Sequence, residues 1–227
     1  MCRFKSAIIL KDRVFIPDYD SHSDMLDELG IEDTRQNAEK LFIRAELSPE
    51  NGDVFSNIDN WKFVVDQDIL PDWYVKDYDK QRMIEAVKEW AKDRIHIGVD
   101  NLKINSGANH YIKDCKDVNI YGSATVKNIC GSATVKNICG SATVEYIYGS
   151  ATVEYICDSA TVEYICDRAT VETAKGFSII RTSPYSKFNN RDKLILLENA
   201  TLKDCYEKKI YQSGDFKLVS VSNGKCE

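Results

Sequence analysis

A nine-residue repeat in the middle of the chain constrains the fold more than any other feature of the sequence. The copies read SATVKNIC, SATVKNIC, SATVEYIY, SATVEYIC, SATVEYIC and a shortened RATVETA, each separated from the next by one Gly or Asp. β-Branched residues at a short fixed period, with turn residues between the copies, indicate stacked strands that cannot bury their faces alone. The range Ser123 to Thr173 is therefore predicted to form a short parallel β-solenoid.

The repeat also predicts which side chains face inward. Alternation along a strand places Ala124 and Val126 inside and Thr125 and Lys127 outside. Ile129 follows Val126 by three positions, so the strand must bend between them if both are to be buried. The corners fall at residues that tolerate positive φ, namely Gly131, Gly140, Gly149 and Asp158.

The number of repeats in one coil decides which outer residues stack. Two repeats, or about 18 residues, are favoured, and a three-sided coil of three repeats is the alternative. With two repeats, one outer column holds Lys127, Glu145 and Glu163, and another holds Lys136, Glu154 and Glu172. The tyrosines Tyr146, Tyr155 and Tyr164 are expected to cover the outer surface at the bends. A calcium-binding roll is excluded because the Gly-Gly-x-Gly-x-Asp turns are missing.

Composition describes a folded and mildly acidic protein. The 227 residues are 43% hydrophobic and 29% charged, with a net charge of −6, so direct nucleic-acid binding is not expected. No apolar run reaches the roughly 20 residues of a membrane helix, and the start MCRFKSAIIL lacks signal-peptide features. An intracellular, cytoplasmic protein is expected, whose eight cysteines are reduced thiols.

Three regions are predicted along the chain: a mixed α+β domain over 1–97, the solenoid with an N-terminal cap over 98–175, and a β-rich segment over 176–227 that can continue the solenoid. The cap would be the drifted copy Cys115–Gly122, and Asn199–Leu202 resembles the start of another copy. A terminal hairpin is expected from Lys208–Gln212 and Phe216–Val221.

The first region carries patterns of both strands and helices. A hairpin is expected from Arg3–Leu10 and Arg13–Pro17, followed by two short helices near Ser21–Gly30 and Thr34–Lys40. Two strands are expected at Leu41–Leu47 and Trp61–Val65. A long helix is expected over Asp77–Arg94. The long helix places Met83, Ile84, Val87, Trp90 and Ala91 on one apolar face.

Cys2 is the candidate nucleophile of the chain. Removal of Met1 would leave an N-terminal cysteine able to act as its own base. The opening Met-Cys-Arg-Phe resembles the start of class II glutamine amidotransferase domains, which implies an enzyme acting through Cys2. The competing interpretation, an ordinary cysteine on the first strand, is favoured.

Two other groups could hold a metal ion. Asp18, Asp20, His22 and Asp24 alternate along a short segment, but Asp and Ser before a helix usually serve as caps, and that interpretation is favoured. Cys139 and Cys157 would be neighbours at one corner of a two-repeat coil, without the four ligands of a structural zinc site. No cofactor motif or catalytic triad is found, so no cofactor is predicted.

The chain resembles a group of uncharacterised proteins of phages and mobile elements. The similarity lies in Met-Cys-Arg-Phe-Lys-Ser, in Val65–Trp73 and in the Ala-Thr-Val repeats, and it implies a bacterial host but no particular activity. We expect a non-enzymatic interaction protein, in one form a phage-encoded inhibitor of a host defence protein. Its binding surface would be Glu145, Glu154, Glu163, Glu172, Tyr146, Tyr155 and Tyr164. The alternatives are the Cys2 enzyme and a structural protein that assembles through its solenoid ends.

Overall fold

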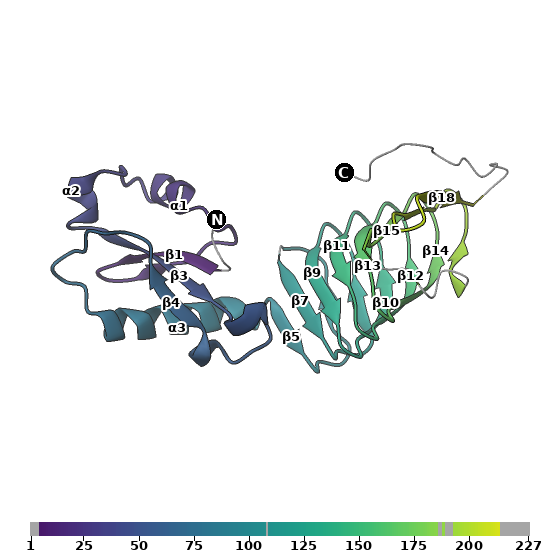
Figure 1. The fold of residues 1–227 in the computed structure, drawn as a ribbon, viewed down its shortest axis with the longest axis horizontal. Helices are drawn as coiled ribbons and strands as arrows, with labels where there is room; N and C mark the ends of the chain where they lie inside the picture. The colour runs from purple at the N-terminus through teal and green to yellow at the C-terminus, as the bar shows by residue number, and fades with distance from the viewer. Residues whose placement is uncertain (1–4, 108, 186–187, 189–192, 214–227) are drawn as a thin grey trace. The chain divides into compact units, whose positions relative to one another are not determined.

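The computed structural model describes residues 5–107, 109–185, 188 and 193–213. The chain divides into two compact units, residues 1–93 and 94–227, which are described separately. The strands of the second unit form a parallel β-solenoid of about six turns, shown in teal to yellow in Figure 1. Among the described residues, no helix has the length and apolar character that crossing a membrane requires.

The first unit is a four-stranded antiparallel sheet with helices on both faces (Figure 1). The strand order is β2-β1-β3-β4. The elements are β1 (Lys5–Leu10), β2 (Val14–Phe15), α1 (His22–Glu28), α2 (Arg35–Ala38), β3 (Phe42–Ser48), β4 (Lys62–Val65), α3 (Lys76–Lys92) and the short 3-10 helices η1 (Glu50–Gly52) and η2 (Ile58–Asn60). All of the predicted elements of this region are therefore present.

β3 is buried on both of its faces. Phe42 and Ile43 point to opposite faces and both are fully buried, because α1 and α2 lie over one face of the sheet and α3 over the other (Figure 1). Phe42 packs with Met25 and Leu26 of α1. Ser21 caps α1, accepting a 3.3 Å hydrogen bond from the backbone N–H of Asp24.

The second unit contains two sheets that alternate along the chain. One sheet has the order β18-β17-β15-β13-β11-β9-β7-β5 and the other β16-β14-β12-β10-β8-β6. The repeat strands are β9 (Thr125–Cys130), β10 (Thr134–Ile138), β11 (Thr143–Ile147), β12 (Thr152–Ile156), β13 (Thr161–Ile165) and β14 (Thr170–Ala174). The flanking strands are β5 (Ile95–Ile97), β6 (Lys103–Ile104), β7 (His110–Lys113), β8 (Val118–Ile120), β15 (Ile179–Thr182), β16 (Ile195–Leu196), β17 (Thr201–Asp204) and β18 (Lys209–Gln212).

Register confirms two repeats per coil. Val144 is paired in parallel with Val126 on one side and with Val162 on the other, a step of 18 residues in each direction. Ala142, Val144 and Ile147 are fully buried, and the same three positions are buried in the other complete copies. These side chains form one continuous apolar interior. Stacking of the coils buries the apolar face of each strand, which a single strand could not bury alone.

The corners are formed by residues with positive φ, as the repeat predicts. Gly131, Gly140 and Gly149 have φ of 67°, 74° and 71°, and Asp158 has φ of 58°. Side chains at some corners also bond to the neighbouring coil, and Asp158 Oδ2 accepts a 2.9 Å hydrogen bond from the Gly140 N–H. These bonds satisfy backbone donors that lie outside the strand ladders.

The solenoid continues beyond the repeats at both ends. The drifted copy at Cys115–Gly122 contributes β8, but β8 lies between β6 and β10, so it is an internal strand and not an end cap. At the other end, β17 continues the parallel stack, which confirms the interpretation of Asn199–Leu202. β18 then pairs antiparallel with β17. The predicted partner of this last strand, Phe216–Val221, lies outside the described residues.

Candidate functional site

The predicted binding residues lie on the outer surface of the solenoid, but on two different sheets. Tyr146 and Tyr164, with Glu145 and Glu163, belong to β11 and β13 of the eight-stranded sheet. The six-stranded sheet carries the other three, Glu154 and Tyr155 on β12 and Glu172 on β14. Each tyrosine lies within a strand, between the buried valine and the buried isoleucine of its copy. Tyr146 and Tyr164 are register partners.

Tyr146 and Tyr164 form a small aromatic surface. Their rings stack with centroids 5.2 Å apart and an interplanar angle of 17°. Tyr146 is 42% exposed, and Tyr155 on the other sheet is 44% exposed. Both tyrosines are therefore open to solvent, and each lies on a strand that pairs with a neighbouring strand on both sides.

Charge on these faces is mixed. Lys127 forms an ion pair with Glu145 of the next coil, and Lys136 lies 3.1 Å from Asp117. The expected column of Lys127, Glu145 and Glu163 therefore begins with an ion pair. It ends with Glu163, which forms no ion pair with the described residues. We call Tyr146, Tyr164, Glu145 and Glu163 the tyrosine face.

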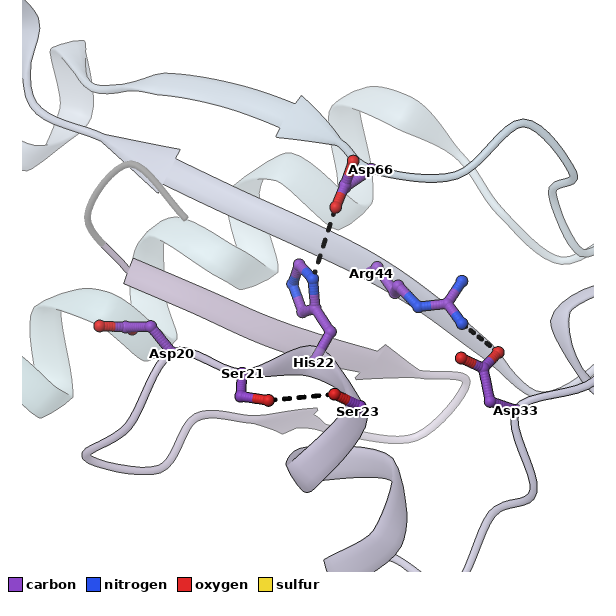
Figure 2. A pocket seen from close by; sticks show the side chains of 7 residues that line it. All are labelled: Asp20, Ser21, His22, Ser23, Asp33, Arg44 and Asp66. Carbon is purple, nitrogen blue, oxygen red and sulfur yellow. Dashed lines mark hydrogen bonds and ion pairs between the residues drawn. The ribbon is translucent and has the colours of Figure 1, made fainter. Parts of the chain in front are cut away.

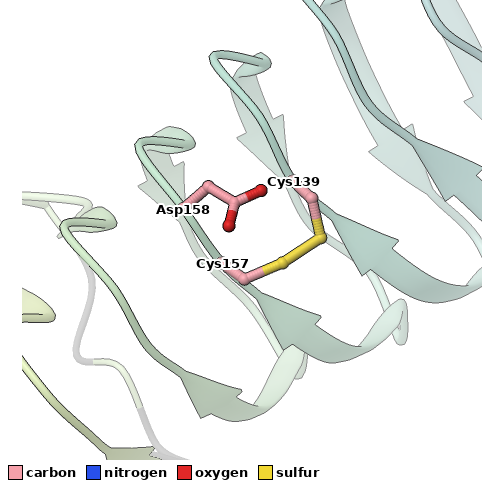
Figure 3. A group of neighbouring side chains, drawn as sticks. All are labelled: Cys139, Cys157 and Asp158. Atoms are coloured by element: carbon pink, nitrogen blue, oxygen red, sulfur yellow. A yellow bond between two sulfur atoms is a disulfide. The ribbon is translucent and has the colours of Figure 1, made fainter.

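The corner cysteines behave differently from the expected reduced thiols. Cys139 and Cys157 are joined by a disulfide across one coil, with Cα atoms 4.7 Å apart (Figure 3). Stacking places the two residues within the distance that a disulfide spans. Asp158 lies beside them, but bonded sulfurs offer no thiolate to a metal, and the Asp158 carboxylate already accepts the Gly140 N–H.

Four of the other cysteines are free thiols: Cys115, Cys130, Cys166 and Cys205. Burial is the main reason that the pKa values of Cys115 and Cys166 are raised above the ordinary thiol value. A protonated thiol is a poor nucleophile and a poor metal ligand, so these two are assigned to packing. Cys2 lies outside the described residues.

The aspartates of the Asp18–Asp24 segment point to different partners. Asp18 accepts a 3.1 Å hydrogen bond from Trp90 Nε1, and Asp20 pairs with the buried Lys5 at 2.9 Å. Asp24 lies in the first turn of α1. The structure therefore does not gather these three carboxylates around His22.

His22 instead faces residues from elsewhere in the first unit. An open depression of about 680 Å³ is lined by Asp20, Ser21, His22, Ser23, Asp33, Arg44 and Asp66, as Figure 2 shows. His22 Nδ1 lies 3.6 Å from Asp66 Oδ2, and Arg44 pairs with Asp33. Sequence patterns missed Asp66 because it is 44 positions from His22 and follows the end of β4.

Comparison of the chain with protein-family models, with curated proteins and with solved structures finds no match.

Proposed function

We propose that the protein is a non-enzymatic interaction module that binds a protein partner through the outer surface of its solenoid. The observation that carries this proposal is the stacked pair of the exposed Tyr146 and the half-buried Tyr164 on a continuous parallel sheet. Tyrosine supplies a large amphipathic contact area with few rotatable bonds, and it is enriched among residues that dominate binding energy. The sheet holds both rings in place before binding, which lowers the entropy lost on association.

The charges around the tyrosines favour a partner with a basic contact surface. Glu163 follows Glu145 in the same column, and Lys127 neutralises only Glu145. Acids beside aromatic rings select a partner that presents Lys or Arg next to an apolar patch, since such charges set orientation and association rate. One form of the proposal is a phage-encoded inhibitor that covers a basic surface of a host defence protein.

Imitation of a nucleic acid is the less favoured version of that inhibitor. About six turns at roughly 4.8 Å per coil give a stack of about 29 Å, comparable with about eight base pairs. A mimic would need an unbroken line of negative charge, and the first position of each column is a lysine, Lys127 in one and Lys136 in the other. We therefore propose recognition by aromatic and acidic groups together.

Site-specific photo-crosslinking tests the proposal. A benzophenone amino acid is placed at Tyr146 in one protein and at Tyr78 in another, and each is exposed to a bacterial host lysate. Tyr78 is the matched control because it is a tyrosine, 64% exposed, on a helix of the first unit. One dominant crosslinked protein from Tyr146 and none from Tyr78 is the expected result.

The captured protein is then purified and its affinity is measured directly. Tyr146→Ser combined with Tyr164→Ser should weaken binding by more than about tenfold, whereas Tyr78→Ser should leave it unchanged. Equal crosslinking from both positions, or an affinity that the double variant does not alter, would contradict the proposal.

The two alternatives have direct tests of their own. An enzyme acting through Cys2 requires removal of Met1, and intact-mass measurement shows whether the methionine is retained. End-to-end assembly requires open parallel edges, yet β18 adds an antiparallel strand to one end of the eight-stranded sheet. Light scattering across a concentration series checks for growth in particle mass.

A further inference from the structure

A buried histidine and two carboxylates meet on one face of the sheet in the first unit. His22 comes from α1, Glu46 from β3, and Asp66 directly follows β4. One potential ligand atom from each of the three side chains lies within 4.8 Å of the other two. Figure 2 shows the His22 ring directed toward Asp66, while Asp20 extends away from both.

The backbone determines which nitrogen of His22 carries a proton. Nε2 lies 3.2 Å from the carbonyl oxygen of Ala45, and a carbonyl can only accept, so Nε2 must donate. In a neutral imidazole Nδ1 is then a bare acceptor. It faces the acceptor oxygens of Glu46 and Asp66, and acceptors arranged in this way are joined either by a proton on Nδ1 or by a metal ion. A second nitrogen that donates to a backbone carbonyl is also the usual arrangement of a metal-ligating histidine.

Glu46 gives an independent reason to expect a ligand. Its residue exposure is only 9%, and with the described residues its carboxylate forms neither a hydrogen bond nor an ion pair. Ser6 lies directly opposite on β1, and its buried hydroxyl also has no hydrogen-bond partner among the described residues. A carboxylate on a largely buried residue is poorly hydrated and gains from a positive partner, which points to a cation at this site.

Two cationic side chains of the same sheet, among the residues that the structure describes, have other partners. Arg44 pairs with Asp33 and lies over the ring of Phe42, and Lys5 pairs with Asp20. A neutral His22 with ionised Glu46 and Asp66 leaves two negative charges. A divalent ion would neutralise both.

We propose that His22 Nδ1, Glu46 and Asp66 bind one divalent transition-metal ion of the Zn²⁺ or Mn²⁺ type. Mixed imidazole and carboxylate ligands suit these ions, whereas Mg²⁺ and Ca²⁺ prefer oxygen alone. Metal–ligand bonds of about 2.1 Å place neighbouring ligand atoms roughly 3.4 Å apart in a tetrahedron, close to the 3.6 Å between His22 Nδ1 and Asp66 Oδ2. The Asp66 side chain is 63% exposed, so water completes the coordination from the open side. The site is independent of the tyrosine face.

Mn²⁺ is the probe for the test, because the free cysteine thiols of the chain would compete for Zn²⁺. The full-length protein is titrated at neutral pH, free Mn²⁺ is followed by its paramagnetic resonance signal, and broadening of amide NMR signals locates the ion. One Mn²⁺ per chain should bind, with broadening first at Ser6, His22, Glu46 and Asp66. Glu46→Gln and Asp66→Asn should each weaken binding by about tenfold or more.

Asp33→Asn is the matched control. It removes the same charge from the same depression, but Asp33 pairs with Arg44, so the affinity should change by less than about threefold. If Glu46→Gln does not fold, Asp66→Asn alone decides, because its side chain is largely exposed. Absence of binding at roughly 1 mM Mn²⁺, broadening elsewhere in the chain, or an equal loss in Asp33→Asn would overturn the proposal.

Discussion

Oδ1 of Asp114 accepts two hydrogen bonds from Ser132, one coil later: 2.7 Å from the backbone N–H and 2.9 Å from the hydroxyl. Asp114 has a φ of 55°. Its side chain accepts a hydrogen bond from the backbone N–H of Ser132, at the corresponding corner of the next coil. This contact links two coils outside the strand ladders. Asp158 and Asp167 make the corresponding bond to the coil before them, to the N–H groups of Gly140 and Gly149.

The Asp114 contact predicts a low carboxyl pKa. The backbone N–H of Ser132 and then its hydroxyl bind the ionised form, which lowers the pKa of Asp114 below its ordinary value. A depressed folded-state pKa stabilises the protein above the unfolded pKa, and that stabilisation is lost as the pH falls through the folded value. NMR titration of the Asp114 carboxyl should show a low pKa in the wild type and a higher one in Ser132→Ala. Ser150→Ala, at the equivalent position one coil later, should leave it unchanged.

The corner residue Asp158 allows a test of backbone conformation. Asp158→Ala keeps a side chain at positive φ, which costs about 1–2 kcal/mol, and it removes the acceptor of the Gly140 N–H. Asp158→Gly loses the same bond but relieves the conformational cost. In urea unfolding, the Ala variant should be about 1–2 kcal/mol less stable than the Gly variant. Equal stability of the two would show that positive φ is not maintained at this corner.

The solenoid interior predicts a large cost for truncating one apolar side chain. Ile147 is fully buried between coils, so Ile147→Ala should lower the free energy of unfolding by about 2–5 kcal/mol. Ile97 on β5 of the same unit is 52% exposed, and Ile97→Ala should change it by less than about 0.5 kcal/mol. Both values come from chemical denaturation, and similar effects for the two variants would contradict the described interior.

The disulfide predicts a redox-dependent stability. Linking Cys139 to Cys157 closes a loop of 18 positions, which in a chain-entropy estimate contributes about 3 kcal/mol. Cys139→Ser should lower the free energy of unfolding by about that amount under non-reducing conditions, and added reductant should bring the wild type to the same value. Cys166→Ser, which alters a free thiol at another corner, is the control. An unfolding midpoint of the wild type that reductant does not move would contradict the linkage.

A buried ion pair predicts a weak point in the first unit. Asp79 is 1% exposed, lies 2.8 Å from Arg82 and accepts the Val75 N–H. Asp79→Ala leaves the Arg82 charge without this partner and should destabilise the unit by about 3–5 kcal/mol. Asp77→Ala, in the exposed part of the same helical turn, should change stability by less than about 0.5 kcal/mol. Thermal unfolding followed by circular dichroism compares the two variants.

The repeat by itself determined the coil of the solenoid. Val144 must face inward with Val126 and Val162 because a nine-residue period leaves each strand one apolar face, and stacking is the only way to cover it. The same regularity predicted the corner residues and the proximity of Cys139 to Cys157. Local patterns were also sufficient for the elements of the first unit, since hairpins, caps and helical stripes depend on neighbours in sequence.

Only the tertiary structure decided where the solenoid begins and which side chains form sites. Strands such as β5 and β6 carry no Ala-Thr-Val pattern, and they join the stack because backbone pairing with β7 and β8 does not require it. His22, Glu46 and Asp66 come from three separate elements. Their proximity depends on the order of the strands and on the position of the helix. Both are set by long-range packing, which produces no repeating pattern in the sequence.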